Sequence, residues 1–519
     1  MDKKKTIIGK DVIESLTLGM YEDSKFIYRE YIQNAADQID KAVDEGLLSS
    51  IRDGHIWIKI DNRSKKISIE DNATGISYGK IEDVLKNIAQ SHKERGVDKG
   101  FRGIGRLGGL GYCDELRFIT SFKGEDVRSV MVWNAKELKD IINDRSKKET
   151  ASDVIDKVVH TDIESEDSDK HYFKVELLRV NNAALLDRDN IKDYLKMVAP
   201  VAFHPRFMFK DKIYNDLKDN NLSIDEYRIY VGTEEVFKGY TTSIYQADRK
   251  KKDEIKNIKT FKLSNPDDEL LAWGWYSISN FDGVIPNVNK ARGIRLRKDN
   301  IQIGSDTTLT KLHPQKKNQN YFFGEVHAFN SELIPNARRD YFIENEYCEY
   351  FEKELRDLFD QILKPIFNIA SKLRGADISL LALKEKRKDI DKLNETGITS
   401  KEEKAKIEHE LEMCKKRAEK GKRYLERVRN EIEEKKDDEK TNVVKQLYDN
   451  IVKSDTVKIN KTADTIIDKL NQIPNRTDKY SKLTRKERKL IVKIFEVIDA
   501  VLSKELAENL KHKIDDKFT

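Results

Sequence analysis

The sequence lacks the features that mark several common protein classes. Its 519 residues include only three cysteines, Cys113, Cys348 and Cys414, and no Cys-x-x-Cys pair. Isolated thiols predict neither a disulfide framework nor a zinc site. No apolar run approaches the ~18 residues of a membrane-spanning helix, and residues 1–10 lack the apolar core of a secretion signal. We therefore expect a soluble cytoplasmic protein that makes no contact with a membrane.

A strong charge of one sign is also missing, since 98 Lys and Arg against 93 Asp and Glu leave a net charge of +5. This excess is too small over the whole length to predict nucleic-acid binding. The hydrophobic fraction is only 38% and the charged fraction is 37%, which indicates that part of the chain is helix with solvated faces. The length itself predicts roughly three domains.

Helix and strand signals mix in the first part of the chain. Helical spacing covers residues 11–45, and strand-like alternation follows at 56–60, 67–69, 116–120 and 172–177. The polar stretch 143–169 predicts a surface insertion. We expect a first domain at 1–205 and a second, α/β domain at 206–345, where runs such as 227–231 and 273–278 predict strands.

Strand signals are missing after residue 345, and we expect long helices with a coiled-coil hairpin over 346–440 and a helical segment over 441–519. The predicted seam consists of Ile407, Leu411, Cys414, Ala418, Gly421, Leu425, Val428 and Ile432, with a looser stripe at Leu373, Ala376, Leu380, Leu383 and Ile390. Steps of four and three along this seam require a partner helix. An antiparallel hairpin within the chain fits best, although a coiled coil between chains uses the same pattern.

Capping signals mark where these helices begin. Ser400 and Glu403 have capping-box spacing after the break at 394–397. Thr484 and Glu487 repeat the spacing before a last amphipathic helix, whose predicted apolar stripe is Ile494, Ile498, Val501 and Leu502.

The first long helix carries polar residues on one face. Glu30, Asn34 and Asp37 are spaced at i, i+4 and i+7. A carboxylate on this face can activate a water, and an amide oxygen is a hard ligand suited to Mg²⁺. Taken alone, the pattern also fits an ordinary amphipathic surface helix.

Two further elements follow in order. Ile69–Ile76 reads as a strand entering a tight turn, where the Asp71 carboxylate can accept a hydrogen bond from an adenine amino group. Residues 99–111 then hold six glycines, which let backbone amides approach phosphates closely. This segment lacks the Gly-Lys-Ser/Thr of a P-loop and the βαβ setting of a dinucleotide fingerprint.

Together the three elements resemble the GHKL ATPase superfamily, most closely the heat-shock chaperone of about ninety kilodaltons. The segment 29–37 is similar to the family's catalytic helix, which implies Glu30 as general base, Asn34 as Mg²⁺ ligand and Asp37 as part of the nucleotide site. Asp71–Gly75 is similar to the family's Asp-x-Gly-x-Gly turn for adenine, with Ala73 at the first glycine.

The resemblance continues through the segment that closes over the nucleotide. Residues 88–91, ending at Ser91, are similar to the entry of the family's ATP lid, and Lys93 lies in this segment. The lid's glycine motif around the phosphates corresponds to Gly100, Gly103 and Gly105. For Lys93, a solvent-exposed lysine is the alternative.

In the second domain, Glu332–Asp340 resembles the chaperone's catalytic loop. The resemblance implies that Arg339 reaches the γ-phosphate of ATP and stabilises developing charge, and it leaves Arg295 and Arg297 as reserve candidates. A surface loop with a paired arginine is the alternative. The implied fold class is α+β: a GHKL (Bergerat) ATP-binding α/β sandwich, an α/β transducer-like middle domain and an α-helical coiled-coil region.

The expected function is that of an ATP-hydrolysing, chaperone-like clamp that closes a lid, forms a homodimer and binds a protein client or effector, with ATP and Mg²⁺ as ligands. One alternative is a nucleic-acid clamp like MORC or MutL proteins, supported by basic clusters at 249–252 and 485–489. Another is an ATP sensor within a defence or stress assembly.

Overall fold

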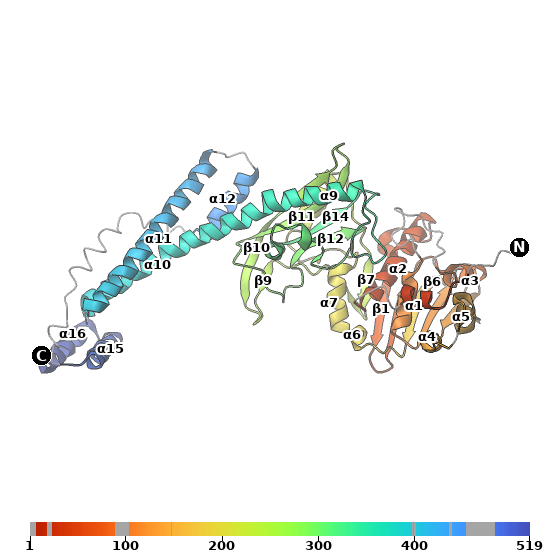
Figure 1. Ribbon diagram of the computed structural model, residues 1–519, viewed down its shortest axis with the longest axis horizontal. Helices are drawn as coiled ribbons and strands as arrows, with labels where there is room; N and C mark the ends of the chain where they lie inside the picture. Colours follow the sequence, from red (N-terminus) through yellow and green to blue (C-terminus); the bar gives the residue numbers. More distant parts are fainter. Residues whose placement is uncertain are drawn as a thin grey trace. The chain divides into compact units, whose positions relative to one another are not determined.

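The computed structural model describes residues 7–17, 23–88, 103–146, 148–396, 398, 401–434, 439–452 and 483–518. The chain divides into two compact units, residues 1–362 and 363–519. The first unit contains two β-sheets with their helices, and the second is built of helices (Figure 1). The expected α+β class is confirmed. Among the described residues, no helix is long and apolar enough to cross a membrane.

An eight-stranded sheet in the order β5-β4-β3-β6-β2-β1-β7-β8 organises the first part of unit 1. Neighbouring strands pair antiparallel except β1 and β7, which are parallel. The strands are β1 (His55–Asp61), β2 (Lys66–Asp71), β3 (Glu115–Ser121), β4 (Val127–Trp133), β5 (Val159–Ser165), β6 (Tyr172–Leu178), β7 (Arg228–Val231) and β8 (Glu234–Glu235). The predicted strands at 56–60, 67–69, 116–120 and 172–177 are confirmed by β1, β2, β3 and β6.

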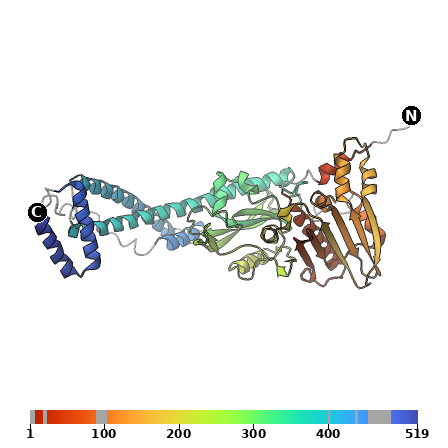
Figure 2. The same cartoon turned by 90° about the horizontal axis from the view of Figure 1, so that it is seen from below.

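The helices of this part are α1 (Asp11–Thr17), α2 (Phe26–Asp44), α3 (Ile81–Leu85), α4 (Ala135–Asn143), α5 (Ala151–Val158), α6 (Ala183–Leu186) and α7 (Arg188–Val198). Helix α2 runs alongside the sheet in both views (Figures 1 and 2) and shares one apolar core with its strands. The short 3₁₀ helix η3 (Gly105–Gly111) packs on α2.

The prediction of a surface insertion at 143–169 is wrong. This stretch forms α5 and the edge strand β5, which pairs with β4 from Val127 opposite Ser165 to Trp133 opposite Val159. The segment reads as polar because β5 lies at the sheet edge, where most of its side chains meet solvent. Strand β7, which lies beyond the predicted boundary at 205, also pairs in this sheet, while the boundary itself stays a prediction.

A second, six-stranded sheet has the order β13-β12-β14-β11-β10-β9. Its strands are β9 (Ser243–Tyr245), β10 (Lys251–Ser264), β11 (Leu270–Ser279), β12 (Gly293–Lys298), β13 (Ile301–Gln302) and β14 (Phe323–Ala328). Helices α8 (Lys210–Asp219) and α9 (Glu346–Asp357) accompany it, with 3₁₀ turns η4 (Thr308–Leu312) and η5 (Lys316–Tyr321) before β14. An aromatic core that includes Phe203, Tyr240 and Trp275 packs beneath the sheet.

Unit 2 comprises α10 (Lys364–Thr396), α11 (Lys401–Glu434), α12 (Glu439–Ile451), α15 (Arg485–Val501) and α16 (Lys504–Phe518). Helices α10 and α11 pack within the chain as an antiparallel hairpin: Lys386 bonds Glu410 at 2.7 Å, and Gly421 lies against Ala376. The predicted seam residues Leu411, Ala418 and Leu425 are buried. The predicted capping box at Ser400 and Glu403 falls outside the described residues.

The last two helices pack against each other. The capping box of Thr484 and Glu487 is confirmed at the start of α15. The predicted apolar stripe is only partly right, because the buried face consists of Ile491, Phe495 and Ile498, whereas Val501 is 74% exposed.

Candidate functional site

Helix α2 forms one wall of the candidate site. Aromatic side chains fix its position: the Tyr28 hydroxyl donates to the Leu185 carbonyl at 2.7 Å, and the Tyr31 hydroxyl donates to the Arg106 carbonyl at 3.1 Å. The backbone amide of Gly109 in turn donates to the Tyr31 hydroxyl at 3.1 Å. Because these groups are buried, the helix is held rigidly against the glycine-rich segment.

The predicted polar face of α2 is not a solvated surface. Glu30 and Asp37 are buried, and Asn34 is half-buried. The Oε1 atom of Glu30 makes no hydrogen bond within the described part of the chain, and its nearest ion pair is to Nε of Arg29 at 3.8 Å. A buried carboxylate oxygen without a hydrogen bond is costly for folding alone, so its presence points to a functional role.

The turn after β2 is shaped around Asp71. Oδ1 of Asp71 accepts the Ala73 amide at 3.0 Å, and His171 Nδ1 lies 2.8 Å from the Ala73 carbonyl oxygen. Gly75 has a φ of +67°, and a Cβ there would lie 1.9 Å from the Ser121 carbonyl oxygen. Only glycine fits at this position. Ala73 is fully buried, so the turn accommodates the methyl group where the resembling family has glycine.

Burial changes the acidity of the Asp71 carboxyl group. It raises the pKa of Asp71 to about 7, an effect that the hydrogen bond from the Ala73 amide partly opposes. Asp71 is 3% exposed and stands at the end of β2, where the turn begins. It can therefore accept a hydrogen bond from a buried amino group, and such a donor would favour its charged form.

The glycine-rich segment approaches α2 closely. A Cβ at Gly105 would lie 2.2 Å from Oε2 of Glu30, so a side chain at this position would displace the carboxylate. Gly103 has a φ of +66°, which also favours glycine. Ser91, Lys93 and Gly100 lie outside the described residues. The structure thus brings Gly105 beside Glu30.

Arg339 comes from the loop between β14 and α9. Its φ of +53° is rare for a residue with a side chain, and its carbonyl accepts the Gly304 amide at 2.7 Å, which fixes the loop. Burial lowers the pKa of Arg339, while the nearby charge of Glu30 acts in the opposite direction. Its Nε and Nη1 atoms have no hydrogen-bond partner among the described residues.

The two reserve arginines differ from each other. Arg297 is fully buried, bonds Glu325 at 2.5 Å and donates to the carbonyls of Met197 and Asn300 at 2.6 and 2.7 Å. These bonds tie β12 to the end of α7, so Arg297 is a structural residue. Arg295 donates to Gln302 Oε1 at 2.7 Å but keeps Nε without a partner among the described residues.

Sequence reasoning missed several polar groups around these residues. The Thr120 hydroxyl accepts the Ile76 amide at 2.8 Å and so supports the turn, and the Thr74 hydroxyl donates to Gln38 at 2.9 Å. Arg106 is largely buried, which lowers its pKa to about 10. Arg29 could have been found from the sequence, because it directly precedes Glu30. The contacts of Thr120 and Gln38 join distant segments, so no local sequence pattern predicts them.

Known protein families match the part of the chain that contains α2, the turn after β2 and the glycine-rich segment. Residues 26–168 match the model of the family described as histidine kinase-, DNA gyrase B- and HSP90-like ATPase. Curated relatives include the chaperone protein HtpG of Clostridium acetobutylicum, 23% identical over 42% of this chain and 35% of the relative. HtpG of Alkaliphilus metalliredigens is 30% identical over 23% of this chain and 21% of the relative.

The alignments thus span about a fifth to a third of the length of these relatives. Residues 26–168 carry a GHKL-type ATPase domain, and the chain resembles the HSP90 group within that superfamily.

Proposed function

We propose that this protein is an ATP-dependent, chaperone-like molecular clamp. The observation that carries the proposal is that Glu30, on α2, and Arg339, on the loop after β14, lie close enough for their charges to interact. Both are buried, both have polar atoms without hydrogen bonds among the described residues, and the charge of Glu30 acts directly on Arg339. A terminal phosphate between them would meet a base and a cation together.

Each residue has a role in this reaction. The Asp71 carboxylate accepts the adenine amino group, and Gly103 and Gly105 let the backbone approach the phosphates, together with Gly100, Ser91 and Lys93 of the lid. Glu30 takes the proton of the attacking water. Arg339 stabilises the charge that develops on the phosphates, and Asp37, on the same face of α2, favours the charged form of Arg339.

The residues present fit a magnesium ion held mainly by phosphate and water. The half-buried Asn34 supplies an amide oxygen one helical turn from Glu30. Mg²⁺ with a nucleotide needs only one or two protein ligands, and it would neutralise phosphate charge. Asn34 is the residue that we propose as its ligand.

Glu30 and Arg339 come from different parts of the chain, so a movement between these parts can switch hydrolysis on and off. ATP closes the lid, draws Arg339 onto the γ-phosphate and brings two protomers together, and hydrolysis reverses these steps. A protein client or effector would contact the second sheet and the helical unit. The structure gives the nucleic-acid alternative no added support at 249–252, where Lys251 pairs with Glu254 at 2.7 Å and Lys252 donates to the Val284 carbonyl at 2.8 Å.

The decisive experiment measures ATP turnover and nucleotide binding by the purified full chain and its Glu30→Gln variant. General-base catalysis contributes about 10²- to 10⁴-fold, so turnover should fall by at least about 100-fold while binding persists. Glu45→Gln, an exchange of an exposed carboxylate at the end of the same helix, is the matched control and should keep both. Failure of the wild type to bind nucleotide would refute the site; binding without turnover in every variant would favour an ATP sensor.

A further inference from the structure

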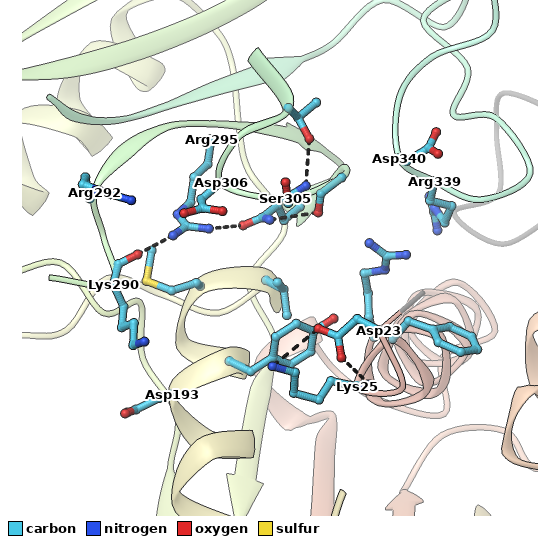
Figure 3. A pocket seen from close by; sticks show the side chains of 18 of the residues that line it. Asp23, Lys25, Asp193, Lys290, Arg292, Arg295, Ser305, Asp306, Arg339 and Asp340 are labelled. Atoms are coloured by element: carbon cyan, nitrogen blue, oxygen red, sulfur yellow. Dashed lines mark hydrogen bonds and ion pairs between the residues drawn. The ribbon is translucent and has the colours of Figure 1, made fainter. Parts of the chain in front are cut away.

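A cavity of about 650 Å³ lies beside the proposed catalytic residues and away from the adenine turn. Its walls come from the start of α2, from α7, from β12 with the loop before it, and from the segment around Ser305 (Figure 3). Seven cationic side chains line it against four carboxylates, an excess of three positive charges. A cavity of this size accommodates a small organic ligand.

Three of the cations are arginines that are at least nine-tenths buried. Arg29 and Arg295 are each 6% exposed, and Arg339 is 7% exposed. All three have an Nε atom without a hydrogen-bond partner in the described chain, and Arg339 has a second such atom, Nη1. Arg29 and Arg339 lie close enough that the charge of Arg29 disfavours that of Arg339. The Glu30 carboxylate, 3.8 Å from Arg29, balances part of this charge, and the donors that stay unfilled among the described residues can bind a further anion.

The carboxylates of the cavity do not fully balance these guanidinium groups. Asp23 pairs with Lys25 at 3.4 Å, and Asp193 pairs with Lys196 at 2.7 Å. The Asp340 carboxylate accepts from Asn336 at 2.5 Å. Only Asp306 lies beside Arg295, as Figure 3 shows, and its charge favours the charged form of that arginine.

Arg295 and Arg292 donate hydrogen bonds to neutral oxygen atoms. Arg295 donates to the Gln302 amide oxygen at 2.7 Å and to the Lys290 carbonyl. Arg292 donates to the side-chain oxygen of Asn287. Lys290 is exposed at the rim. Because their hydrogen bonds go to neutral oxygens, the guanidinium groups of Arg292 and Arg295 keep most of their positive charge for a ligand.

We propose that this cavity is a second ligand site, which binds a small anion bearing two or more phosphate groups. Arg295 and Arg292 hold one end of the ligand, and Arg29 and Arg339 hold the other. Because Arg339 borders both this cavity and the proposed ATP site, occupancy of the cavity would compete for that side chain and slow hydrolysis. A free oligophosphate and a phosphorylated metabolite share this chemistry.

The test is calorimetric titration of tripolyphosphate into the full chain saturated with ADP, so that the nucleotide site is already filled. Lys290→Ala combined with Arg292→Ala should weaken tripolyphosphate binding by about tenfold or more and leave ADP binding unchanged. Lys218→Ala combined with Lys250→Ala removes two exposed lysines elsewhere around the second sheet and is the matched control. Thermal melting checks that all variants are folded.

The outcomes separate this site from the nucleotide site. Tripolyphosphate binding that survives ADP saturation and the Asp71→Asn exchange, and that depends on Lys290 and Arg292, supports the proposal. Absence of binding, displacement by ADP, or equal weakening in both double variants overturns it. Inorganic phosphate and a phosphorylated sugar are the further probes: equal affinity for inorganic phosphate contradicts a multi-phosphate ligand, and tighter binding of fructose 1,6-bisphosphate than of tripolyphosphate identifies a metabolite as the source. ADP binding is measured throughout, so failure of the proposed ATPase would be seen separately.

Discussion

Two buried charge clusters in unit 1 contrast sharply. Around β12 and β14, Glu325 is bonded to Arg297 at 2.5 Å, Lys238 at 2.6 Å and Tyr240 at 3.1 Å, and all are buried. Although burial opposes it, Arg297 and Lys238 hold the pKa of Glu325 well below its usual value. Around α2, Glu30 and Arg339 are also buried but have polar atoms without hydrogen bonds among the described residues.

The difference teaches how to separate structural from functional arginines in one chain. Arg297 and Arg339 were both candidates for phosphate contact by resemblance, and burial alone does not distinguish them. Arg297 uses its donors on Glu325 and on backbone carbonyls, so it has little left to offer a ligand. Within the described part of the chain, Arg339 keeps N–H donors free for a ligand. Burying these donors without hydrogen bonds lowers the stability of the fold, so a need for stability does not explain them.

The largest effect on stability is expected for Arg297→Ala. Removing it leaves Glu325 buried with fewer partners and frees the carbonyls of Met197 and Asn300, so unfolding free energy should fall by about 3–5 kcal/mol. Urea denaturation measures this. Arg297→Lys keeps the positive charge but loses the planar set of donors. Its unfolding free energy should lie between those of the wild type and Arg297→Ala. If Arg297→Ala lost less than ~1 kcal/mol of unfolding free energy, the hydrogen bonds around Glu325 would not distinguish that cluster from the one around Glu30.

Arg339→Ala should produce the opposite result. Turnover should fall by about 10²- to 10³-fold, as for other groups that stabilise developing charge. Stability should change much less than in Arg297→Ala, because Arg339 has donors that are unbonded within the described residues and Arg29 stays beside Glu30 in the variant. Phosphate release and urea denaturation on the same preparation check both. A double-mutant cycle with Glu30→Gln in which the two effects are independent would contradict their joint action.

A smaller effect, near tenfold, is expected from pH. Because the pKa of Asp71 is raised to about 7, its carboxyl group should be mostly protonated at pH 6 and mostly charged at pH 8. Adenosine, which has no titrating phosphate, should therefore bind about tenfold more tightly at pH 8. Calorimetry measures the affinities. In Asp71→Asn the pH dependence should vanish; its persistence would place the titrating group elsewhere.

The raised pKa of Asp71 also predicts how the stability of the ligand-free protein depends on pH. A raised folded pKa means that the folded state binds the proton more tightly than the unfolded state. The contribution of Asp71 to stability is therefore fully present below about 3.8 and is lost as pH rises through about 7. Adenosine should offset part of that loss above pH 7. Melting temperatures of the wild type and Asp71→Asn, compared across this pH range, measure the contribution of Asp71.

The smallest effect is expected from an exposed ion pair in unit 2. Lys386 and Glu410 are 2.7 Å apart, but their side chains are 32% and 43% exposed. Lys386→Ala should cost only about 0–1 kcal/mol and less at high salt. Urea denaturation at two salt concentrations tests this. A cost as large as that of Arg297→Ala would show that the burial of Arg297 does not explain its larger effect on stability.

The sequence alone determined the local features of this protein. Alternation in residues 56–60 and 116–120 identified β1 and β3, the spacing of Thr484 and Glu487 identified a helix start, and steps of three and four identified the hairpin seam. It also placed Glu30, Asp71 and Arg339 as candidates, whose roles stay predictions. These signals were readable because each depends on neighbours within a few positions along the chain.

Only the tertiary structure decided which charges are satisfied. The pairing of β5 and β7 with distant strands, the bonds of Arg297 to the end of α7, and the cavity beside Arg339 join residues that lie far apart in the sequence. Sequence spacing carries no record of such contacts. Burial and hydrogen bonding, and with them the pKa of Asp71 and the unfilled donors of Arg339, arise only when the elements pack.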